Sequence, residues 1–109
     1  MSIKEMTEKQ LAVWKTYSKQ GTKEWTYETA IQDMPYQVGS VSKLYLQLTN
    51  FRYRDGMTDE MIKEKMADEL ADILSVVFFT AHGLGIDLDK AFNDMLQSDE
   101  TKIAKRSKA

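Results

Sequence analysis

The sequence predicts an all-α protein, a bundle of four to five helices. Gly and Pro are scarce, at five and one of 109 residues. No segment alternates polar and apolar residues over the length of a strand, whereas apolar residues recur at spacings of three and four over most of the chain. That spacing is typical of one face of an α-helix. The length suits one domain, so we expect residues 1–109 to form a single domain.

The first two helices are predicted from apolar spacing and from the residues that end it. We expect the first over about residues 7–18, with a stop at Gln20-Gly21. The second is expected over about residues 27–51. Pro35 either kinks this second helix or starts a new one in its first turn. The apolar stripe of the second helix comprises Ile31, Met34, Val38, Val41, Leu44 and Leu48.

The third helix is predicted from a turn, a cap and a long apolar stripe. Arg54-Asp55-Gly56 is a turn signal, and Thr58 can cap the helix that follows it. Gly83 or Gly85 is the expected end. Residues 73–79 are apolar nearly all round, so this helix needs a second apolar partner. We expect another copy of the chain there, in a homodimer or in a homotetramer built as a dimer of dimers.

The fourth helix is expected over about residues 88–97, capped by Asp87. Residues 102–109 then form a basic tail, interpreted either as solvated or as a contact for phosphate. The formal net charge of −2 gives no reason to expect a nucleic-acid or membrane partner.

The composition also favours a soluble, cytoplasmic protein. Cysteine is absent, which excludes disulfides and thiolate metal sites and is typical of a reducing compartment. The first ten residues contain no apolar segment, and no run approaches the ~18 apolar residues of a membrane span. His82 is the single histidine and is interpreted as structural, at the end of the third helix, rather than catalytic.

Three carboxylates, Asp68, Glu69 and Asp72, stand where the third helix becomes apolar. Glu69 and Asp72 are three residues apart and therefore neighbours on one helix face. Adjacent carboxylates repel unless they share a cation, and Mg²⁺ takes one or two carboxylates together with water and phosphate oxygens. The alternative is a solvated acidic face balanced by Lys63 and Lys65.

The same stretch carries a family resemblance. Asp68-Glu-Leu-Ala-Asp-Ile-Leu74, with Ala81-His-Gly-Leu-Gly-Ile-Asp-Leu-Asp-Lys-Ala91, resembles the second half of the MazG-like nucleotide pyrophosphohydrolases. The resemblance covers roughly residues 27–102. It implies a MazG-like all-α fold and hydrolysis of nucleoside triphosphates to monophosphate and pyrophosphate with Mg²⁺, or with Mn²⁺ as an alternative. Glu69 and Asp72 match the E-x-x-D motif of that family and become the expected catalytic and metal-binding residues.

The chain departs from the family at its first metal motif. Where the family has Glu-Glu-Val-Gly-Glu-Leu, this chain has Tyr36-Gln-Val-Gly-Ser-Val41, and all three carboxylates are missing. Gln37 and Ser40 supply neutral oxygens at these positions and would line the substrate site. Lys43, near the face of Ser40, would contact phosphate.

Residues outside the two motifs complete the predicted site. Ser98-Asp-Glu-Thr-Lys-Ile103 resembles a Ser-Asn-x-x-Lys stretch of related pyrophosphohydrolases, in which the lysine meets phosphate. Lys102 is therefore a predicted substrate-binding residue, and Asp99 a predicted metal ligand. The aromatic side chains of Trp25 and Tyr36 flank the expected cleft and are candidates for stacking on a base.

Three functions follow from this pattern. The first is a metal-dependent nucleoside triphosphate pyrophosphohydrolase. The second is a catalytically impaired MazG-like module that binds nucleotides or a protein partner, which the missing acids favour. The third is a structural helical dimer in which Asp68, Glu69 and Asp72 only keep one face in water.

Overall fold

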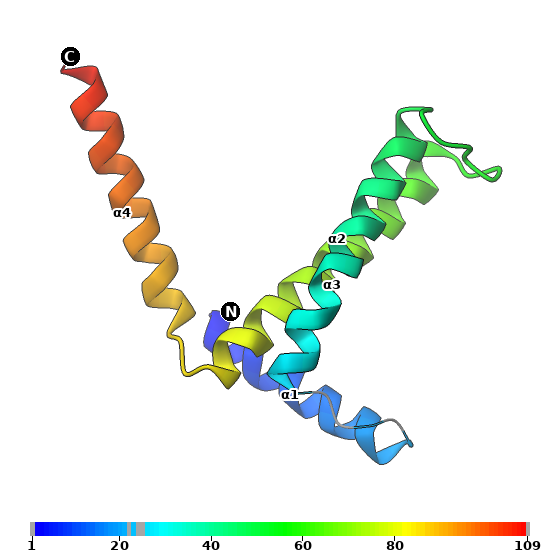
Figure 1. The fold of residues 1–109 in the computed structure, drawn as a ribbon, viewed down its shortest axis with the longest axis horizontal. Coiled ribbons are helices and arrows are strands. Elements are labelled where there is room, and N and C mark those ends of the chain that lie inside the picture. Colours follow the sequence, from blue (N-terminus) through cyan, green and yellow to red (C-terminus); the bar gives the residue numbers. More distant parts are fainter. Residues whose placement is uncertain (1, 22, 24–25, 109) are drawn as a thin grey trace.

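The computed structural model describes residues 2–21, 23 and 26–108. These residues form four α-helices and no strand, which confirms the all-α prediction. Figure 1 shows two of the helices running side by side, with a third across one end and the fourth projecting outward. The helices are α1 (Ile3–Lys19), α2 (Tyr27–Leu48), α3 (Asp59–Gly83) and α4 (Leu88–Ser107).

The predicted start of the first helix is wrong by four residues. α1 begins at Ile3, and Thr7 lies inside it with its hydroxyl donating to the Ile3 carbonyl at 2.8 Å. Ser2 is the cap, because its hydroxyl oxygen accepts from the Glu5 amide at 3.1 Å and also lies 3.2 Å from the Glu5 carboxylate. Ser2-x-x-Glu5 is a capping box, a sequence signal that the apolar spacing alone did not reveal.

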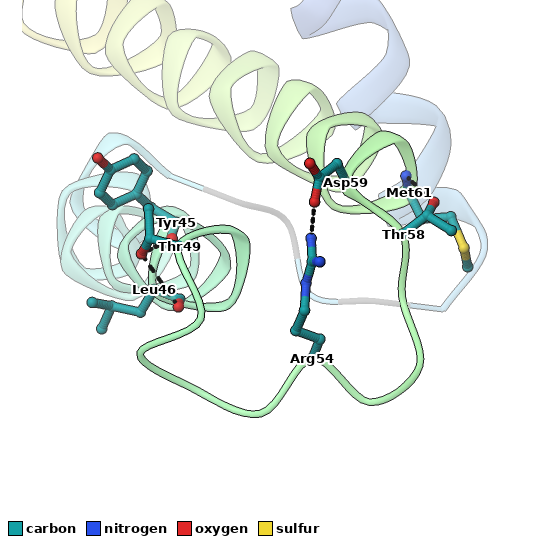
Figure 2. Close-up of polar contacts among 7 residues, drawn as sticks. All are labelled: Tyr45, Leu46, Thr49, Arg54, Thr58, Asp59 and Met61. Atoms are coloured by element: carbon teal, nitrogen blue, oxygen red, sulfur yellow. Dashed lines mark hydrogen bonds and ion pairs between the residues drawn. The ribbon is translucent and has the colours of Figure 1, made fainter.

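The second helix is continuous through Pro35, so a new start at that residue is excluded. α2 ends at Leu48, three residues before the predicted end. The Thr49 hydroxyl donates to the Tyr45 carbonyl at 2.9 Å and to the Leu46 carbonyl at 3.4 Å, and so satisfies carbonyls of the last turn (Figure 2).

The fourth helix is much longer than predicted, because α4 continues from Gln97 to Ser107 and includes most of the predicted tail. Residues 98–107 contain neither Gly nor Pro. Lys105 and Arg106 in the last turn stabilise the helix, because their positive charges lie at the negative end of the helix dipole. The basic segment is therefore an exposed helix end rather than an extended tail.

The antiparallel pair of α2 and α3 is the centre of the fold. Gly83 at the end of α3 lies against Tyr27 at the start of α2, and Ile62 near the start of α3 is fully buried. α1 packs across the end of α3, where the Trp14 and Phe79 rings meet edge to face with centroids 4.3 Å apart. In the part of the chain that the structure describes, the buried apolar residues are few: Ala30, Ile62, Val76, Phe78 and Ala81.

The connection from α2 to α3 is held by buried and charged groups. Gln47 is 3% exposed, and its amide donates to the Tyr53 carbonyl at 3.0 Å. Figure 2 shows the Arg54 side chain reaching Asp59 in the first turn of α3. The hydrogen bond from Arg54, together with the charge of its guanidinium group, lowers the pKa of Asp59. The Thr58 hydroxyl caps α3 by accepting from the Met61 amide at 3.2 Å.

The turn from α3 to α4 is closed at both ends by hydrogen bonds. The Gly85 amide donates to the His82 carbonyl at 3.2 Å, and the Ile86 amide donates to the Ala81 carbonyl at 2.8 Å. With Gly85 at φ +68°, these bonds form a Schellman motif. Asp87 then caps α4 by accepting from the Lys90 amide at 3.1 Å. The two helices therefore meet at a defined bend of 108°.

The single chain is extended for its size. Its radius of gyration is 17.9 Å, whereas a compact domain of this length has a value of about 13 Å. Figure 1 shows the cause, since α4 points away from the α2/α3 pair with the C-terminus at its far end. No single described helix is long and apolar enough to cross a membrane, and only α3 and α4 taken together across their bend meet that test by length and composition.

We expect Gly83→Ala to destabilise the protein by about 1–3 kcal/mol, the usual cost of overpacking. A Cβ at Gly83 would overlap the Cβ and ring of Tyr27. Gly39→Ala is the matched control, because Gly39 is also helical and its Cβ would meet open space. The control should be neutral or stabilising, since Ala favours helix over Gly by about 0.8–1 kcal/mol. Urea denaturation measures both, and equal effects would contradict the predicted contact.

We expect Asp59→Asn to lower stability at neutral pH and to have no effect in strong acid. The lowered pKa of Asp59 means that its stabilising contribution is present above its ordinary pKa of about 3.9 and is lost as the pH falls through the lowered value. Glu60→Gln is the control, because Glu60 shares the first turn but has no pairing with Arg54. Thermal melts of the three proteins from pH 7 to pH 2 measure the difference, and a pH-independent effect of Asp59→Asn would contradict the ion pair.

Candidate functional site

One open cavity of about 520 Å³ lies between the C-terminal half of α2 and the N-terminal half of α3. We call it the Glu69 cavity. α2 contributes residues from Ser40 to Gln47, α3 contributes residues from Met61 to Glu69, and the loop between the helices closes one end. The lining residues are Ser40, Lys43, Leu44, Gln47, Asp55, Met57, Met61, Lys65, Asp68 and Glu69.

Glu69 is the distinctive group of this cavity. Its side chain is half-buried, and its Oε2 atom is buried without a hydrogen-bond partner. Among the described residues, ion pairs join Arg54 to Asp59 and Lys90 to Asp94, and neither includes Glu69. A buried carboxylate oxygen without a partner is costly. The arrangement therefore favours a cation or a donor supplied from outside the chain.

Two lysines place positive charge at the same cavity. Lys43 comes from α2 and Lys65 from α3, so the cations come from opposite walls. Ser40 adds a hydroxyl, and Asp68 adds a second carboxylate beside Glu69. Asp55 adds a third carboxylate from the loop. A cavity that holds both lysines and carboxylates suits an anion that carries its own metal ion.

A second cavity, of about 530 Å³, adjoins the middle of the α2/α3 pair and is covered on one side by α1. We call it the Gln37 cavity. The Gln37 amide donates to the Asp33 carboxylate at 2.9 Å, while the Gln37 Oε1 atom is buried without a partner. The lining residues are Gln10, Val13, Trp14, Tyr17, Lys23, Asp33, Gln37, Ala71, Asp72, Ser75 and Val76.

The lining of the Gln37 cavity contains both hydrogen-bond acceptors and apolar side chains. The Gln37 oxygen and the carboxylates of Asp33 and Asp72 all accept, and Val13 and Val76 supply apolar surface. A flat, partly apolar ligand with amino groups would match these properties.

Helical periodicity places the two cavities on one side of the α2/α3 pair. Asp33, Gln37 and Ser40 follow one another at spacings of four and three along α2. Glu69 and Asp72 are three apart on α3. Glu69 lines the first cavity and Asp72 lines the second, so a ligand in contact with both carboxylates has to span the boundary between the cavities.

The structure brings together some of the residues predicted from sequence. Ser40, Lys43 and Glu69 share one cavity, and Gln37 and Asp72 share the other. Tyr36 is 70% exposed and lines neither cavity.

The remaining predicted residues lie elsewhere or beyond description. Asp99 and Lys102 are exposed on α4, outside the linings of both cavities. Trp25 lies outside the described residues. His82 is in the last turn of α3 and lines a different cavity, near the starts of α1 and α4.

Asp33 is a site residue that the sequence reasoning missed. It stands one helical turn before Gln37, and the spacing of Asp33, Gln37 and Ser40 was the available signal. The sequence suggests only a balancing charge for Lys65, yet Lys65 lines the Glu69 cavity. Gln47 gave no signal, because its burial depends on the return of the loop at Tyr53.

The carboxylates do not by themselves complete a metal site. In the part of the chain that the structure describes, no group of three or more His, Cys, Asp or Glu side chains could hold a metal ion. Mg²⁺ in nucleotide enzymes commonly takes one or two carboxylates, with the rest of its ligands from water and phosphate. The Glu69 oxygen fits that limited role.

Comparison with known proteins gave no match. No family model, curated protein or solved structure matches this chain. The geometry of the two cavities therefore carries the functional argument, and membership in the MazG-like family stays a prediction from the residues.

We expect Glu69→Met to stabilise the ligand-free protein by about 1 kcal/mol, because it removes a buried carboxylate oxygen that has no partner. Asp68→Asn is the control, since Asp68 is exposed and its change also removes one negative charge. The control should stay within about 0.5 kcal/mol of the parent. Urea denaturation without added nucleotide or metal measures both, and a clear loss of stability in Glu69→Met would contradict the assignment.

Proposed function

We propose that this protein is a metal-dependent nucleoside triphosphate pyrophosphohydrolase that releases monophosphate and pyrophosphate. The observation that carries the proposal is the half-buried Glu69, whose unpartnered oxygen lies in a cavity that Lys43 and Lys65 also line. A triphosphate with a divalent cation supplies both the anion that the lysines need and the cation that Glu69 needs. The family resemblance at Glu69-Leu-Ala-Asp72 points to the same substrate class.

In this proposal the triphosphate lies along the Glu69 cavity. Lys43 and Lys65 bind phosphate oxygens from the two walls, and the Ser40 hydroxyl donates a hydrogen bond to a third. Glu69 would hold a magnesium ion at this position. Magnesium, when bound, neutralises the charge that develops on the phosphates.

The reaction is attack of water on the α-phosphorus, with cleavage of its bond to the bridging oxygen and departure of pyrophosphate. Asp72, one turn after Glu69, accepts a proton from the attacking water. Most of the rate comes from holding the water and the triphosphate in line and from neutralising charge, so few protein groups have to react.

The Gln37 cavity is the proposed place for the base. The Gln37 oxygen and the Asp33 carboxylate accept hydrogen bonds from amino groups of a base, and Val13 and Val76 contact its faces. The side-by-side position of the cavities along α2 lets one nucleotide occupy both.

A second candidate is a nucleotide-binding module without hydrolysis. It is favoured by one observation, that the described residues hold no group of three or more acids able to bind a metal. It is consistent with Tyr36, Gln37 and Ser40 at the positions where the resembled family has glutamates. The two candidates share the site and differ only in turnover.

Incubation of the purified protein with Mg²⁺ or Mn²⁺ and a panel of ribo- and deoxynucleoside triphosphates tests the proposal. We expect monophosphate and pyrophosphate, with the rate reduced on the order of a hundredfold or more in Glu69→Gln and Asp72→Asn, since removal of one group that stabilises the transition state typically has such an effect. Chromatography separates the products and gives the rates.

Glu64→Gln is the matched control, because Glu64 is an exposed acid of α3 outside both cavities. Its rate should equal that of the parent. If no nucleotide is cleaved but nucleotide with metal raises the melting temperature of the parent and not of Glu69→Gln, the second candidate holds. Absence of both turnover and stabilisation would exclude the two candidates together.

A further inference from the structure

Exposed apolar residues lie on the side of the α2/α3 pair opposite the two cavities. On each helix, successive residues are about 100° apart. Val38 and Leu70 are therefore turned away from the cavity residues Gln37 and Glu69, and the antiparallel pairing directs them to the same side. We call this surface the apolar face; its members are between 43 and 56% exposed. They are Ile31, Val38 and Tyr45 on α2, and Leu70 and Leu74 on α3.

The projecting helix carries a second apolar surface. Every described residue of α4 is exposed except Leu88, which is half-buried. Four large apolar residues recur along one side of α4 at helical spacing, and they are between 44 and 62% exposed. We call α4 the arm, and its stripe comprises Phe92, Met95, Leu96 and Ile103.

The arm does not lie on the apolar face of its own chain. Only residues 84–87 connect α3 to α4, and the Schellman bonds at Gly85 and Ile86 together with the Asp87 cap hold the two helices at 108°. Figure 1 shows the arm pointing away from α2 and α3 as a result. Within one chain, both apolar surfaces therefore stay in water.

The chain exposes more surface than a compact monomer of its mass. The chain exposes 8398 Å², whereas a compact monomer of its 12.6 kDa mass exposes about 6,200 Å². The excess is about 2,200 Å² per chain, and obligate homodimers bury about 1,000–2,500 Å² per chain. The excess is thus of the size that a stable dimer removes from water.

The stripe of the arm and the apolar face match in character. Each is a row of large apolar side chains at helical spacing, and both are about half exposed. The arm of one copy, laid antiparallel to α3 of another, sets its stripe beside Leu70 and Leu74.

We propose that the protein is a homodimer in which the arms are exchanged. Each arm packs its apolar stripe on the apolar face of the other copy. A two-fold axis repeats the contact, so both apolar surfaces of both chains are covered. The two cavities lie on the opposite side of the pair and stay open, so the assembly does not depend on the proposed enzymatic activity.

Sedimentation equilibrium of the full chain tests the dimer. We expect the parent to have twice the 12.6 kDa chain mass at micromolar concentration. Ile103→Glu should raise the dissociation constant on the order of a hundredfold, because it places a charge in the buried stripe twice per dimer. Gln97→Glu is the matched control, since it adds the same charge to the opposite side of the arm and should leave the mass unchanged. Circular dichroism checks that both variants keep their helix content.

Disulfide cross-linking distinguishes arm exchange from other dimers. The sequence has no native cysteine, so each disulfide has to form between introduced cysteines. We expect a mixture of Leu70→Cys and Ile103→Cys proteins, exchanged and then oxidised, to form a disulfide-linked heterodimer in far higher yield than either protein alone. Efficient cross-linking of Leu70→Cys alone would indicate pairing of the two apolar faces and would overturn arm exchange. A monomeric parent would overturn the proposal altogether.

Discussion

Packing of α2 against α3 is the contact on which the rest of the structure depends. It buries Ile62 completely and brings Gly83 against Tyr27, so the two helices are joined at both ends. α1 adds to this pair through Trp14 and Phe79, and the cavities form along one of its sides. Among the described residues only five apolar ones are buried, so the pair has little core to lose.

The connections at the two ends of α3 are both held in place, but by different interactions. Before α3, the buried Gln47 amide and the Arg54 charge hold the loop against the helices. After α3, backbone hydrogen bonds around Gly85 and a small contact between α1 and the start of α4 fix the direction of α4. An apolar stripe held in that direction is not covered by its own chain, and this is the basis for the proposed exchanged dimer.

The two sides of the α2/α3 pair have opposite character, and this separates the proposed function from the proposed assembly. One side has unpartnered polar oxygens, on Glu69 and Gln37, in open cavities. Such groups lower stability, and proteins keep them where a ligand completes the contact. The other side has large apolar residues in water, which a second protein surface can cover.

The sequence by itself determined the helices, since caps such as Thr58 and Asp87 and the three- and four-residue apolar spacing are local. It also placed Glu69 and Asp72 on one helix face. It missed the Ser2 cap and the length of α4, where apolar spacing is weak but helix propensity continues. Only the tertiary structure decided that Ser40 and Lys43 share a cavity with Glu69, that Asp33 joins Gln37, and that Asp99 and Lys102 lie outside the linings of both cavities. These relations depend on which helix faces meet and on the bend at Gly85, and no local pattern in the chain encodes them.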